Sequence, residues 1–159
     1  MIVKLASRLP AAVLNLFTAS KTFMFNSAVQ RYKSVQVKTS TPGELLMMLY
    51  DGCFRFLNEA VVALEAGDRP RSGERLDRAY AVISEFTTSL KHEVYPDLCT
   101  NLEGVYMFCM SHIVQANIHQ DPEMVREVIR ILEPLRDAFR EAVRQVHSGE
   151  ATLAPIRSR

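Results

Sequence analysis

Several features are missing from this 159-residue chain, and each absence excludes a class of protein. No uninterrupted apolar run reaches the roughly 18 residues that a membrane-spanning helix needs. The three cysteines, Cys53, Cys99 and Cys109, have no paired spacing, which favours a reducing compartment over a disulfide-stabilised domain. No internal repeat or low-complexity tract is visible. The chain is long enough for one globular domain with a real core, and we predict that organisation.

The residue patterns of common catalytic and metal sites are also missing. The sequence has no glycine-rich phosphate loop and no local Ser/His/Asp motif. No glutamate is followed by a histidine three residues later, as the di-metal class of helical bundle requires. We interpret His112 and His119 as surface or internally satisfied histidines, and Cys53 and Cys109 as buried structural cysteines. The sequence therefore predicts no catalytic residue, no metal site, no cofactor and no enzymatic activity.

Acidic residues are absent from the first 39 positions, which carry six basic residues and a net charge of +6. The rest of the chain has 13 basic and 18 acidic residues, a net charge of −5. A mildly acidic body argues against nucleic-acid binding, which needs a basic face. The basic residues 1–27 superficially resemble a presequence, but Pro10 and Asn15 interrupt the apolar part. We favour a poorly ordered N-terminal extension, with Met24 as a candidate natural start.

Four long helical patterns follow, with clear signals at their ends. Thr41, Pro42 and Glu44 form the sequence signature of a capping box. Gly67 marks a helix end, and Asp121 with Pro122 marks a helix start. The expected helices cover about 42–66, 72–93, 97–119 and 121–147, with Pro134 on the polar side of the last. We therefore predict an all-α fold, an antiparallel up-down four-helix bundle, in residues 28–147, with an N-terminal arm at 28–39 and a disordered tail at 148–159.

The apolar residues are distributed unevenly among the four helices. The second and fourth helices carry one apolar stripe each, and Tyr80 belongs to the stripe of the second. The first helix carries apolar residues over an arc of about 200°, more than one core-facing stripe requires. The third helix also has apolar residues outside its stripe: Met107, Phe108, Val114 and Ile118. Either the chain itself buries these extra surfaces, or a partner covers them.

Several motifs resemble those of the FliS-type flagellin export chaperones. Tyr32 and the segment Val35–Thr39 lead into Ser40-Thr41-Pro42 and the string Leu45-Leu46-Met47-Met48-Leu49-Tyr50-Asp51-Gly52. The resemblance continues with Asn101-Leu102, Val105-Tyr106, Ala116-Asn117, Asp121 and Leu135-Arg136-Asp137-Ala138-Phe139, so it covers about Ala28 to Val146. Residues 1–23 have no counterpart in that family, and Val94-Tyr95-Pro96 replaces a glycine-rich approach to the third helix.

The resemblance implies a bacterial cytoplasmic chaperone that binds the disordered C-terminal segment of flagellin. Its implied partners are flagellin and a component of the flagellar export gate, and it implies an N-terminal arm, including Tyr32, that the client displaces. Together with the extra apolar surface, it predicts these client contacts: Tyr32, Met47, Tyr50, Phe54, Val61, Met107, Phe108 and Ile118. The alternative is a non-enzymatic bundle or adaptor whose extra surface pairs with a second copy, and a weak homodimer fits either hypothesis.

Overall fold

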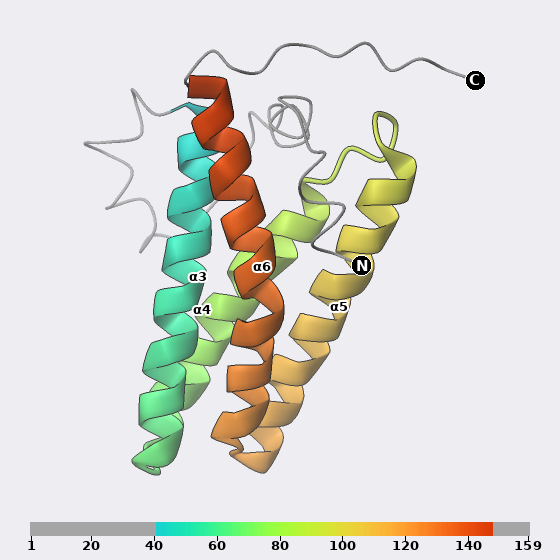
Figure 1. Cartoon of the computed structure of the whole chain (residues 1–159). Helices are drawn as coiled ribbons and strands as arrows, with labels where there is room; N and C mark the ends of the chain where they lie inside the picture. The colour runs from blue at the N-terminus through green and yellow to red at the C-terminus, as the bar shows by residue number, and fades with distance from the viewer. Residues whose placement is uncertain (1–40, 148–159) are drawn as a thin grey trace.

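The computed structural model describes residues 41–147, which form four antiparallel helices. These are α3 (Pro42–Glu65), α4 (Arg69–Thr88), α5 (Pro96–His119) and α6 (Pro122–His147). Each helix packs on two neighbours: α3 and α5 both lie against α4 and α6, and they face each other across the core. Figure 1 shows the four helices side by side, with α5 leaning away from α6 toward the end where α5 begins. The predicted four-helix bundle is confirmed.

Local sequence signals set most of the helix ends. Thr41 accepts a hydrogen bond from the backbone N–H of Glu44, and the Glu44 carboxylate accepts one from the N–H of Thr41 at 2.7 Å, so the predicted capping box forms. At the other end of α3, Gly67 takes a left-handed φ of 69°, which a residue with a side chain adopts at a cost. Asp121 accepts a hydrogen bond from the N–H of Glu123 at 2.8 Å and caps α6.

The helix predicted at 72–93 was placed too far along the chain, since α4 spans Arg69–Thr88. It begins early because the side chain of Asp68 accepts a hydrogen bond from the N–H of Arg71, directly after the turn at Gly67. It ends early at three consecutive hydroxyl residues, Thr87, Thr88 and Ser89. Their hydroxyls donate to carbonyls one turn back, an arrangement that competes with continued helix.

One aromatic side chain from each helix meets at the centre of the bundle. The Phe86 ring lies 4.5 Å from the Tyr50 ring and 5.6 Å from the Tyr106 ring, and Phe139 lies 5.7 Å from Tyr50, centroid to centroid. All four are buried. The Tyr50 and Tyr106 hydroxyls share a hydrogen bond of 2.8 Å between the facing helices α3 and α5. Burial raises the pKa of both phenols, so both stay neutral and hydrogen-bonded.

The hydroxyl pair gives a first prediction. Tyr50→Phe or Tyr106→Phe should lower the free energy of unfolding by about 1–3 kcal/mol, because each leaves the other hydroxyl buried without this partner. The double variant removes both hydroxyls and should lose less than the sum of the two single losses, by about 1 kcal/mol. Urea denaturation of the four proteins measures this coupling. Strictly additive losses would show that the two hydroxyls do not depend on each other.

Candidate functional site

The structure separates the predicted client contacts by burial. Tyr50, Phe54 and Val61 on α3 are buried in the core, and Met47 is half-buried against it. The three predicted residues on α5 are exposed: Met107, Phe108 and Ile118. Tyr32 lies outside the described residues. The exposed candidates therefore all lie on α5, whereas the buried candidates on α3 contribute to the core.

The wide apolar arc of α3 is mostly covered by the chain itself. Because α4 and α6 pack on its two flanks, they bury side chains on both sides of the helix. The guanidinium of Arg136 on α6 lies 4.3 Å from the centre of the Phe54 ring and shields it from water. On the other flank, the guanidiniums of Arg55 and Arg78 lie 5.1 and 5.7 Å from the centre of the Phe56 ring. Of the two alternatives left open for this helix, burial by its own chain accounts for most of the surplus.

The apolar surplus of α5 remains at the surface. Met107, Val114 and Ile118 are 54, 44 and 64 % exposed. Their spacing of seven and eleven residues places them on one line along the helix, since both are close to whole numbers of turns. No Asp, Glu, Lys or Arg occurs from Gly104 to Gln120. We call the surface formed by Met107, Val114 and Ile118 the α5 face.

Phe108 lies on a different flank of the same helix. It follows Met107 by one position, about 100° around the helix. Its ring lies 4.1 Å from that of His112, centroid to centroid, and Nε2 of His112 lies 3.1 Å from a carboxylate oxygen of Glu127 on α6. Phe108 therefore belongs to the side of α5 that faces α6, where a polar link holds the two helices together.

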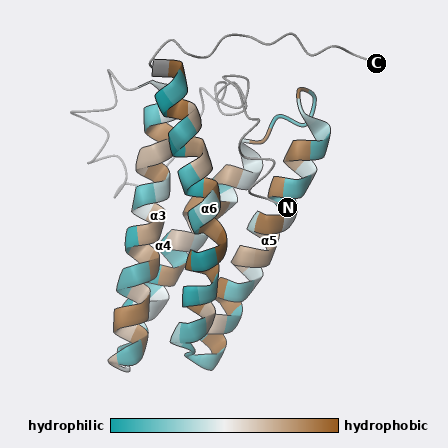
Figure 2. Ribbon diagram, viewed as in Figure 1, coloured by the Kyte–Doolittle hydropathy of each residue, from teal (hydrophilic) through white to brown (hydrophobic). Residues whose placement is uncertain are grey.

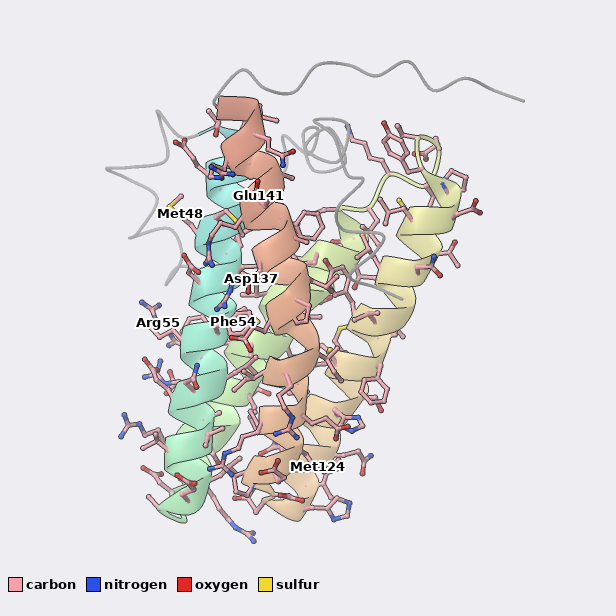
Figure 3. The ribbon with its side chains drawn as sticks, in the orientation of Figure 1. Met48, Phe54, Arg55, Met124, Asp137 and Glu141 are labelled. Atoms are coloured by element: carbon pink, nitrogen blue, oxygen red, sulfur yellow. The ribbon has the colours of Figure 1, made fainter. Side chains whose placement is uncertain are left out.

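The surface shared by α3 and α6 is charged rather than apolar. Arg126 pairs with Glu65, and Arg140 lies 3.3 Å from Asp51, so two ion pairs join these helices. Figure 3 shows Asp137 and Glu141 among the side chains of α6, with Phe54 between α6 and α3. Exposed ion pairs of this kind add little to stability, and a charged surface offers little to an apolar partner. Figure 2 shows the alternation of polar and apolar residues along each helix.

Metal binding and nucleophilic chemistry depend on how the His, Cys, Asp and Glu side chains of residues 41–147 are placed. Within residues 41–147, no three His, Cys, Asp or Glu side chains gather closely enough to hold a metal ion. Cys53 and Cys109 are buried free thiols, and burial raises the pKa of the Cys109 thiol to about 12. Burial raises the pKa of Cys53 as well. Both thiols are protonated at neutral pH, a poor state for a nucleophile.

Two exposed residues, Tyr80 and Val114, were not among the contacts predicted from the sequence. Tyr80 was assigned to the buried stripe of its helix, but the structure places it 39 % exposed, because it lies at the edge of that stripe. Val114 was recognised as lying outside the buried stripe and was not counted as a contact. Its position seven residues after Met107 is the signal that places it on the α5 face.

Comparison with known proteins then decides the family. A model of the family described as flagellar protein FliS matches residues 24–146. The chain belongs to the FliS family. It is 36 % identical over 112 residues to the flagellar secretion chaperone FliS of Bacillus subtilis, covering 70 % of this chain and 83 % of the relative. It is 30 % identical over 133 residues to that of Vibrio cholerae, covering 81 % and 98 %.

Membership of the FliS family fits the architecture described above. The match covers all four helices and stops one residue before His147, the last residue of α6. None of the four described helices combines the length and apolar composition needed to cross a bilayer. The FliS relatives are chaperones of flagellar secretion by description, so the chain is a member of a flagellar export chaperone family.

Proposed function

We propose that this protein is a cytoplasmic chaperone that binds the disordered C-terminal segment of flagellin. By covering that segment it prevents premature polymerisation, and it delivers the subunit to a component of the flagellar type III export gate. The FliS family supports the general role. The observation that carries the proposal is the α5 face, an exposed apolar line on a helix that has no formal charge over 17 consecutive residues, 104–120.

The shape of the α5 face favours a helical client. Met107, Val114 and Ile118 lie along the helix axis over eleven residues, a rise of about 16 Å, or roughly three turns of a partner helix. A disordered segment with apolar residues at helical spacing would fold as it packs against this line. The line has no charge for the client to pair with, so apolar burial supplies most of the driving force.

The expected free energy of client binding is consistent with an interaction that is tight but reversible. Burying about 1,000 Å² of apolar surface yields on the order of 25 kcal/mol before costs. Ordering the client and losing rigid-body freedom consume most of this. A net value of about 8–12 kcal/mol corresponds to a dissociation constant between about 1 μM and 1 nM. A chaperone that must later hand over its client needs such a range.

Titration calorimetry of the full chain with a flagellin C-terminal peptide tests this proposal. We expect binding with a negative heat-capacity change of a few hundred cal/mol/K, because about 1,000 Å² of apolar surface leaves water. A peptide of the same composition in scrambled order is the control. Absence of binding at tens of micromolar would contradict the proposal. Sedimentation that shows a tight dimer of the client-free protein would favour the oligomerising bundle instead.

A further inference from the structure

Tyr80 on α4 lies on the flank of that helix that faces α5. It follows Gly73 by seven residues, so the two share one side of α4. A Cβ at Gly73 would lie 3.8 Å from Oδ1 of Asn117 on α5, which shows that this side of α4 borders α5. The opposite side of α4 faces α3, where Arg75 lies 3.0 Å from Glu59. Tyr80 is thus an exposed aromatic at the seam between α4 and α5.

The register of the two helices places Tyr80 beside the α5 face. Gly73 is level with Asn117 at one end, and Phe86 packs on Tyr106 further along. Because α4 and α5 run antiparallel, these two contacts put Tyr80 at the level of residues 110–112. That level falls between Met107 and Val114, within about 7 Å along the axis of each. Tyr80 therefore borders the middle of the α5 face.

The other side of α5 has a different character. There Phe108 packs on His112, and His112 is linked to Glu127. A client helix on that side would have to lie over the polar His112–Glu127 pair, whereas the side toward α4 offers the Tyr80 ring and the apolar side chains of the α5 face.

We infer that the client segment lies on the α4 side of α5, over the seam, with Tyr80 as a specificity-determining contact residue. The inference rests on the proposed function and assigns its interface to two helices. The occupant is one amphipathic helix of flagellin's C-terminal segment, with an uncharged contact face that matches the charge-free line of the α5 face. Tyrosine suits this place, since its ring has a large contact area and only two side-chain torsions to fix, while its hydroxyl remains at the wet edge.

Single substitutions in the full chain test the inference by calorimetry with the flagellin C-terminal peptide. Tyr80→Ala should raise the dissociation constant at least 10-fold, and Tyr80→Phe, which keeps the ring, should stay within about 3-fold of wild type. Phe108→Ala reports on the opposite flank and should raise the dissociation constant less than Tyr80→Ala does. Thermal unfolding of each variant verifies that the folded protein is being titrated.

Each outcome of this experiment has one meaning. If Tyr80→Ala binds the peptide as tightly as wild type, or if Phe108→Ala loses more affinity than Tyr80→Ala does, the client does not lie over the seam between α4 and α5. The proposed function would remain in place. Failure of the wild-type protein to bind the peptide would overturn both. If Tyr80→Ala instead dissociates a dimer of the client-free protein in sedimentation, the occupant is a second copy and the inference is wrong.

Discussion

Val114→Lys is expected to raise the dissociation constant for the flagellin C-terminal segment by about 30-fold or more. Val114 lies on the α5 face, and a bound client would have to cover the new ammonium group or force it aside. Such desolvation costs about 2–4 kcal/mol even when the long side chain bends toward water, and each 1.4 kcal/mol is a factor of ten in affinity. Titration calorimetry measures the change.

The matched control for Val114→Lys is Val62→Lys. Val62 is 58 % exposed on α3, so the same substitution is made on a helix outside the proposed interface. We expect its affinity within about 2-fold of wild type. Both variants should unfold within a few degrees of wild type, because both side chains are exposed and lysine favours helix more than valine does. Equal losses of affinity in the two variants would exclude α5 as the specific binding surface.

Phe86→Ala is expected to have the largest effect on stability, a loss of about 3–5 kcal/mol in the free energy of unfolding. Phe86 is buried between Tyr50 and Tyr106, so truncation leaves a cavity where three helices meet. Because a domain of this size has roughly 5–15 kcal/mol in total, the melting temperature should fall by more than about 10 °C.

Tyr80→Ala is the control for Phe86→Ala, since it truncates an aromatic on the same helix at an exposed position. It should cost about 1 kcal/mol or less. Differential scanning calorimetry of both variants compares the two sites. A loss of less than about 1 kcal/mol in Phe86→Ala would show that the four-ring cluster does not hold the bundle together.

The helix ends show how much of the fold could be predicted from local sequence. Thr41, Gly67 and Asp121 act through backbone groups within a few residues, so their patterns were sufficient to place three helix boundaries. The end of α4 was placed five residues too late, because an apolar stripe continued through Leu90 while the hydroxyls of Thr87, Thr88 and Ser89 ended the helix. The spacing of apolar residues indicates which positions are buried. It does not by itself indicate where the backbone hydrogen bonds of a helix stop.

The candidate site was harder to predict than the fold, for a reason visible in α3 and α5. Both helices have more apolar residues than one stripe, but the width of an arc does not reveal which neighbour covers it. The apolar arc of α3, which includes Tyr50 and Phe54, is covered by two packed helices and by the Arg136 guanidinium. The residues Met107 and Ile118 of α5 have no such cover among the described residues. Only the three-dimensional arrangement separates the two cases.

Side-chain methyl NMR of the full chain, titrated with the flagellin C-terminal peptide, tests the central claim most directly. The claim is that a client covers the α5 face. We predict large shifts or broadening of the Met107, Val114 and Ile118 methyl signals, while those of Val62 and Met48, which are exposed on α3, stay in place. Perturbation of Val62 and Met48 with unchanged signals on α5 would contradict the account and move the binding surface to α3.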